Sequence, residues 1–206
     1  MHNNLFKALI FDMGEVLVKT FDRNPRTKLA SQFNLTFEEL EKLVYLSDSA
    51  TMAMSGKISE VDHFNFVLQA LGNPNLSIDE FQKAFWGGDN IDPELIAFIN
   101  SLKNQYKLGL LSNAMDTTRQ RLTKSYNLMD YFHVSIFSYE VKMVKPNPEI
   151  FRLILDKLKV APSEAIFIDD MHENIEAANA LGIKTIHAKS TINTVESIQI
   201  LLGMKS

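Results

Sequence analysis

The 206-residue sequence contains no cysteine. This absence excludes disulfides, cysteine nucleophiles and thiolate metal sites, and it fits a reducing compartment. Apolar runs long enough to cross a bilayer are also absent, and the N-terminus lacks the basic region and cleavage site of a signal peptide. We therefore expect a cytoplasmic protein that does not enter a membrane.

A strong excess of charge is missing as well. The formal net charge is −4, so the sequence does not indicate a basic surface for nucleic acid. Apolar residues make up 46% and charged residues 22% of the chain, which is typical of a globular protein and unlike a disordered one. The length suffices for one well-packed domain with a small inserted domain.

The most informative stretch of the sequence lies near the N-terminus. An apolar run over residues 8–11 ends abruptly at Asp12, Gly14 follows, and a second apolar run begins at Val16. This pattern is typical of a buried parallel strand that enters a tight turn. An acid at the carboxyl end of such a strand lies where open α/β sheets bind ligands. The alternative is an aspartate that only caps the next segment.

The chain between Val18 and about Leu108 carries helical signals and no convincing strand. Thr36 with Glu39 matches a capping box, and Asp92-Pro93 matches the start of another helix. Residues 19–25 are polar and indicate a connection. These signals predict a helical insertion, in which we expect His63 to be exposed.

From Lys107 onward, apolar runs alternate with helical patterns. The runs are residues 108–111, 134–137, 165–168 and 185–187. Alternating strands and helices predict a parallel sheet with right-handed crossovers. We therefore predict an α/β fold, with a Rossmann-like core made by residues 1–18 and 101–206 and a helical cap made by residues 19–100.

Polar side chains follow several of these predicted strands. They are Asp12, Ser112, Asn113, Lys145, Asp169 and Asp170. Because parallel strands share one carboxyl edge, we expect these groups to converge. Three carboxylates beside a single lysine raise one another's pKa, and a divalent cation removes that cost. Oxygen ligands without cysteine or clustered histidine favour Mg²⁺.

Four motifs, FDMGEV, LLSNA, KPNPEIF and FIDDMHENI, occur in an order and at a spacing that resemble one known family. They are similar to those of the haloacid dehalogenase-like (HAD) hydrolases with a helical cap inserted after the first motif. The resemblance covers nearly the whole chain. It implies a Mg²⁺-dependent phosphatase that acts on a small phosphorylated metabolite such as a sugar phosphate, as a monomer or homodimer.

The resemblance also implies a role for each motif. Asp12 matches the nucleophile that forms an aspartyl-phosphate, and it also binds the metal. The other implied metal ligands are the main-chain carbonyl of Gly14 and the acids Asp169 and Asp170. Ser112, Asn113 and Lys145 match the phosphate-binding groups, and Lys145 also balances charge at the nucleophile. Asn174, one helical turn after Asp170, is expected to orient that loop.

The sequence departs from the family at Gly14, where phosphatases of this kind usually carry a second aspartate. That aspartate is a general acid and base, a role worth typically ~10²–10⁴ in rate. Glu15 could replace it. Without a replacement, we expect a preference for good leaving groups, such as anomeric or acyl phosphates. Arg23 could contact the distal part of a substrate, or lie in a solvated hinge.

Two other functions remain open from the sequence. The first is a metal-free 2-haloacid dehalogenase, in which Asp12 displaces halide from carbon. That chemistry does not need the second aspartate either, but the acids at positions 169 and 170 would repel an anionic haloacid. The second is a non-catalytic binding protein with the same fold.

Overall fold

The computed structural model describes residues 5–204. Its core is a five-stranded parallel sheet in the order β5-β4-β1-β6-β7, which confirms the predicted α/β fold. The strands are β1 (Ala8–Phe11), β4 (Lys107–Ser112), β5 (Val134–Phe137), β6 (Ala165–Asp169) and β7 (Lys184–His187). The N-terminal strand β1 is central and pairs with both β4 and β6.

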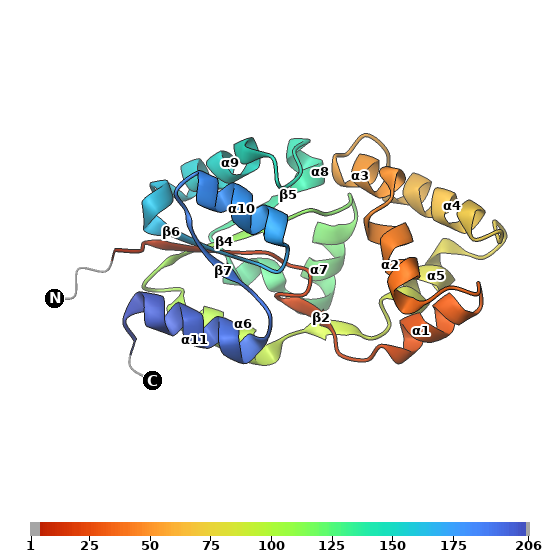
Figure 1. Ribbon diagram of the computed structural model, residues 1–206, viewed down its shortest axis with the longest axis horizontal. Helices are drawn as coiled ribbons and strands as arrows, with labels where there is room; N and C mark the ends of the chain where they lie inside the picture. Colours follow the sequence, from red (N-terminus) through yellow and green to blue (C-terminus); the bar gives the residue numbers. More distant parts are fainter. Residues whose placement is uncertain (1–4, 205–206) are drawn as a thin grey trace.

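Helices cover both faces of this sheet (Figure 1). On one face, α9 (Pro148–Leu158) and α10 (His172–Ala180) pack against Ala8 and Ile10 of β1. On the other face, α6 (Pro93–Leu102), α7 (Thr118–Tyr126) and α11 (Thr191–Leu202) pack against Leu9 and Phe11. Successive side chains of a strand point to opposite faces, so β1 has to be apolar at every position.

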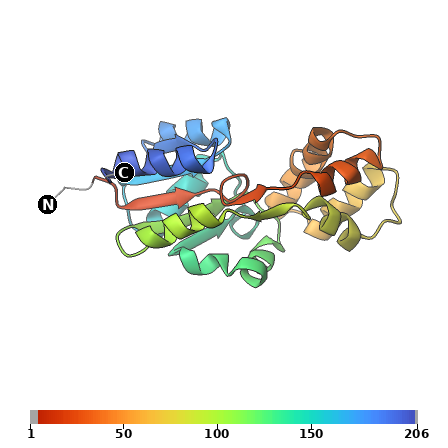
Figure 2. The ribbon, with the colours of Figure 1, turned by 90° about the horizontal axis from the view of Figure 1, so that it is seen from below.

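The helical insertion forms a second lobe with its own apolar core (Figure 2). Its helices are α1 (Asn24–Ser31), α2 (Phe37–Tyr45), α3 (Asp48–Met54), α4 (Glu60–Ala70) and α5 (Ile78–Phe85). The predicted capping box of Thr36 and Glu39 begins α2. Phe64, Phe81 and Phe85 are fully buried at the centre of this lobe. We call this lobe the cap.

Two short strands connect the cap to the core, so the expectation of no strand between Val18 and Leu108 was wrong. β2 (Val18–Thr20) and β3 (Asp89–Ile91) form an antiparallel pair. Lys19 and Thr20, expected in a polar connection, belong to β2. Each strand has three residues and is only half-buried, so neither gives an apolar run. They become strands because they pair with each other.

Helix α6 belongs by its packing to the core. Leu95, Ile96, Ile99 and Leu102 lie in the buried cluster beneath the sheet. A cap boundary at residue 100 would separate most of this helix from the cluster in which it is buried. We therefore propose that the cap ends at β3, where the chain returns to the core. Among the helices of residues 5–204, none is both long and apolar enough to cross a membrane.

Candidate active site

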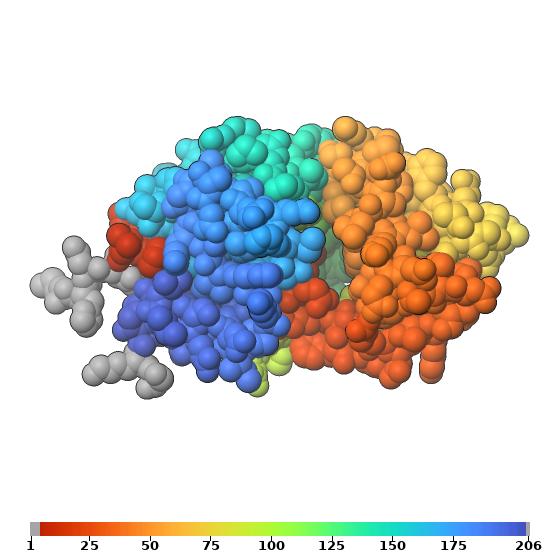
Figure 3. Space-filling view, viewed as in Figure 1, coloured from red at the N-terminus to blue at the C-terminus, as the bar shows by residue number. Residues whose placement is uncertain are grey.

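The parallel sheet places the predicted site residues at one edge. Asp12 directly follows β1, and Asp169 ends the neighbouring strand β6. Ser112 ends β4 on the other side of β1. All three side chains are buried. This edge faces the cap (Figure 2), and the surface is hollowed between the α10 side of the core and the α2 side of the cap (Figure 3).

Lys145 connects the two acids. Its Nζ atom lies 2.6 Å from Asp12 Oδ1 and 2.6 Å from Asp169 Oδ2. The side chain of Asn113 holds the backbone of this lysine in place. Asn113 Oδ1 accepts from the Lys145 N–H at 2.8 Å, and Asn113 Nδ2 donates to the Lys145 carbonyl at 2.9 Å. The Asn113 side chain thus positions the lysine, a role that the sequence did not indicate.

Three carboxylates form what we call the acidic cluster. Asp12, Asp169 and Asp170 each offer an oxygen atom, and these atoms lie within 4.8 Å of one another. Asn174 Nδ2 donates to both oxygens of Asp169, at 3.0 and 3.1 Å. The N–H of Met171 donates to Asp169 Oδ1 at 2.8 Å. These contacts fix the orientation of the Asp169 carboxylate.

The carboxylates of the acidic cluster outnumber the positive charge beside them. Burial, opposed by Lys145 and reinforced by Asp169 and Asp170, raises the pKa of Asp12 to about 7. Burial and the charge of Asp169 raise the pKa of Asp170 to about 6. Burial alone would lower the pKa of Lys145, but Asp12 and Asp169 hold it above its ordinary value. One lysine therefore does not balance three acids.

The acidic cluster fits a hard divalent cation. A cation bound there would stabilise the ionised carboxylates and reverse the rise of their pKa values. The available donors are all oxygen atoms, which Mg²⁺ prefers.

The turn after Asp12 leaves open space beside Gly14. Gly14 is exposed, and a Cβ atom built on it would meet no other atom within 4 Å. Glu15 is exposed in a left-handed conformation, with φ of +52°. Its charge contributes to the raised pKa of Asp170. Glu15 therefore lies near the acidic cluster, but it makes no hydrogen bond with Asp12.

The structure places two cap residues that the sequence singled out, Arg23 and His63. Arg23 is exposed, and its Nη2 atom lies 2.5 Å from Glu38 Oε1, so it forms an ion pair within the cap. His63 was expected to be exposed, and this was wrong, because it is fully buried. Its Nδ1 atom lies 2.9 Å from Ser49 Oγ. His63 follows the buried Glu60 by three residues on α4, which places both on the inward face of the helix.

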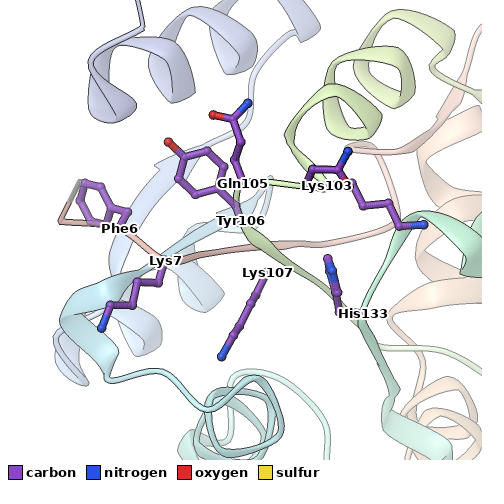
Figure 4. A pocket seen from close by; sticks show the side chains of 8 residues that line it. Phe6, Lys7, Lys103, Gln105, Tyr106, Lys107 and His133 are labelled. Atoms are coloured by element: carbon purple, nitrogen blue, oxygen red, sulfur yellow. The ribbon is translucent and has the colours of Figure 1, made fainter. Parts of the chain in front are cut away.

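A separate pocket of about 480 Å³ lies at the opposite edge of the sheet (Figure 4). Lys7, Lys103 and Lys107 give it a basic lining. Each of these lysines already has a partner: Lys7 pairs with Glu164, and the other two donate to backbone carbonyls. The pocket contains none of the predicted site residues and offers no clear chemistry.

Known proteins resemble this chain in sequence. A family model described as haloacid dehalogenase-like hydrolase matches residues 6–182. D-ribitol-5-phosphate phosphatase of Bacteroides thetaiotaomicron is 26% identical over 97% of this chain and all of its own length. Phosphorylated carbohydrates phosphatase of Thermotoga maritima is 32% identical over 46% of this chain and 43% of its own.

A solved structure shares the fold. A HAD family enzyme from Bacteroides thetaiotaomicron, in complex with magnesium and inorganic phosphate, superposes with a TM-score of 0.75 at 27% identity. The match covers 90% of this chain and 96% of that enzyme.

Proposed function

Because this chain belongs to the haloacid dehalogenase-like hydrolases, we propose that it is a Mg²⁺-dependent phosphatase that hydrolyses a small sugar or polyol phosphate. The observation that carries the proposal is the acidic cluster beside Lys145, which joins a buried nucleophile to an oxygen-rich cation site. The similar phosphatases named above act on phosphorylated carbohydrates or polyols, which supports the substrate class.

Asp12 is the proposed nucleophile. Its carboxylate attacks phosphorus, the bond from phosphorus to the leaving oxygen breaks, and an aspartyl-phosphate forms. Attack by water on that phosphorus then releases inorganic phosphate and restores Asp12. Because Gly14 has no side chain, the leaving alkoxide takes its proton from water.

The other residues bind and orient the phosphate. Lys145 holds the Asp12 carboxylate and offers positive charge to the transferring oxygens. The hydroxyl of Ser112, at the end of β4, is the proposed donor to the phosphate. Asp12, Asp169, Asp170 and the Gly14 carbonyl would hold Mg²⁺, which supplies charge neutralisation of the phosphate when bound.

A metal-free dehalogenase is disfavoured by the same cluster. Asp169 and Asp170 lie beside the nucleophile, where their charge would repel an anionic haloacid. Metal dependence therefore distinguishes the two reactions.

The test is hydrolysis of para-nitrophenyl phosphate with Mg²⁺ and with EDTA. We expect wild-type turnover that EDTA abolishes, and a loss of at least ~10³-fold in Asp12→Asn, because the amide is not a nucleophile. Asp156→Asn, an exposed position on α9, is the matched control and should keep full activity. Turnover that survives in Asp12→Asn, or release of halide from a 2-haloacid without metal, would contradict the proposal.

A further inference from the structure

The cap contacts the core at a place far from the two connecting strands. Helix α3 lies beside α8 (Ser138–Val141) in Figure 1, and residues 54–60 run from the end of α3 to the start of α4. Lys142 Nζ donates to the Gly56 carbonyl at 2.9 Å. We call residues 54–60 the docking segment.

Ser138 joins the docking segment to the loop that follows Ser112 and Asn113. Its side chain is fully buried. Its hydroxyl donates to the Met54 carbonyl at 2.6 Å and accepts from the Ala114 N–H at 2.9 Å. A single hydroxyl therefore connects the cap, the core helix α8 and the residue directly after Asn113.

Glu60 holds the other end of the same loop. It is 2% exposed although it carries a charge. Its Oε2 atom accepts from Thr117 Oγ1 at 2.6 Å, and its Oε1 atom lies 3.2 Å from Arg121 Nη1. The Glu60 N–H donates to Asp116 Oδ1 at 3.0 Å. Moving the cap away from the core would separate the buried Glu60 carboxylate from its core partners. This is costly, because it leaves buried polar and charged groups unpaired.

The middle of the loop is also held by the cap. Met115 belongs by sequence to the core, but it is buried in the apolar cluster of the cap. The guanidinium of Arg121 lies 3.8 Å from the ring centre of Trp86, at the end of α5. Residues 114–117 are therefore held to the cap through the Ser138 hydroxyl at one end, through Met115 in the middle and through Glu60 at the other end.

We propose that Glu60 and Ser138 form a clamp through which the docked cap positions the Ser112–Asn113 phosphate-binding loop. Glu60 is a positioning residue that never touches the substrate. Cap docking and phosphate binding then stabilise each other, since coupling between two binding events is reciprocal. The coupling part rests on the proposed function, because it takes this loop to bind phosphate.

Cap docking can be measured without catalysis. Trp86 is the only tryptophan of the sequence and lies on the cap side of the junction. Acrylamide quenching of its fluorescence reports undocking. We expect stronger quenching in Glu60→Gln, which loses the charge that Arg121 contacts. We expect the same in Thr117→Val, which removes the core hydroxyl that donates to Glu60. Glu196→Gln, an exposed carboxylate on α11, is the matched control and should quench like the wild type.

The coupling is measured with inorganic phosphate in the presence of Mg²⁺. In Glu60→Gln and Thr117→Val, we expect the phosphate Kd and the KM for para-nitrophenyl phosphate to rise together, by about 5-fold or more. kcat should change much less, because the nucleophile and the metal ligands are untouched. Saturating phosphate should bring the quenching of both variants back toward that of the wild type.

The outcomes separate the two proposals. Unchanged Trp86 quenching in both folded variants would overturn the clamp. Stronger quenching with unchanged phosphate affinity would overturn the coupling alone. A wild-type protein that neither binds phosphate nor hydrolyses its esters would overturn the proposed function and the coupling with it, while the quenching data still decide whether the clamp exists.

Discussion

At the scale of the residue, Gly14 determines what the candidate active site lacks. A Cβ atom at position 14 would meet open space, and the Gly14 backbone is not in the left-handed region. Neither packing nor backbone conformation therefore requires a glycine here. Position 14 therefore lacks a carboxyl group that could protonate a leaving group, although the structure leaves room for one there. The chemistry of the leaving group should therefore limit the rate.

Introducing an acid at this position tests that view. For alkyl phosphates, whose leaving groups are poor, we expect Gly14→Asp to raise kcat by up to ~10²-fold, the lower end of general acid catalysis. The gain should shrink for para-nitrophenyl phosphate, whose leaving group needs no proton. Gly14→Asn has the same shape without the acid and is the control. Equal rates in the two variants would exclude this explanation.

His63 gives a second prediction at this scale, for stability against pH. Burial lowers the pKa of His63 below the ordinary histidine value of 6.5. As the pH falls through 6.5, the unfolded chain takes up a proton before the folded cap does. The stability contributed by neutral His63 is therefore present above pH 6.5 and is lost as the pH falls through the lower folded pKa.

Urea unfolding of the cap, followed by Trp86 fluorescence, measures this effect. We expect the wild type to lose more free energy of unfolding between pH 7.5 and 5.5 than His63→Gln does. His172→Gln changes an exposed histidine and should behave like the wild type. An identical pH dependence in all three proteins would show that His63 does not contribute.

At the scale of the element, Arg26 joins the parts of the cap that meet the connecting strands. It lies on α1 and is 2% exposed. It donates to the Phe85 carbonyl at the end of α5, to both oxygens of Asp89 on β3, and to Glu41 on α2. One guanidinium therefore connects α1 with α2, with the end of α5 and with β3.

Removal of that guanidinium should destabilise the cap. We expect Arg26→Met to cost about 3 kcal/mol, the lower end for breaking a buried ion pair, because Glu41 and Asp89 keep some contact with water. Arg152→Met breaks an exposed pair with Glu149 and should cost less than ~0.5 kcal/mol. Urea unfolding at neutral pH compares the two variants. Similar losses in both would mean that the buried network adds nothing.

At the scale of the whole molecule, the proposed Mg²⁺ site at the acidic cluster should make stability depend on the ion. A ligand that binds only the folded state adds about 2.7 kcal/mol at a hundred times its Kd, which raises Tm by roughly 5–10 °C for a chain of this size. We expect this rise in the wild type by calorimetry, and its reversal by EDTA. Asp169→Asn should lose most of it, and an equal rise in that variant would place the ion elsewhere.

The sequence by itself determined the order of elements and the chemistry at the strand ends. The buried strands are short apolar runs, and Asp12, Ser112 and Asp169 stand where those runs end. This information is local, because propensity, side-chain period and turn residues act over a few positions. The parallel topology followed from the alternation of strands and helices.

Only the tertiary structure decided which of these groups touch. Lys145 meets Asp12 across 133 positions, and the Asn113 side chain supports the Lys145 backbone across 32. β2 and β3, the burial of His63 and the contacts of Glu60 likewise depend on partners far away in the chain. No local pattern encodes such pairings, because their energy comes from desolvation and contacts that exist only once the two lobes have formed.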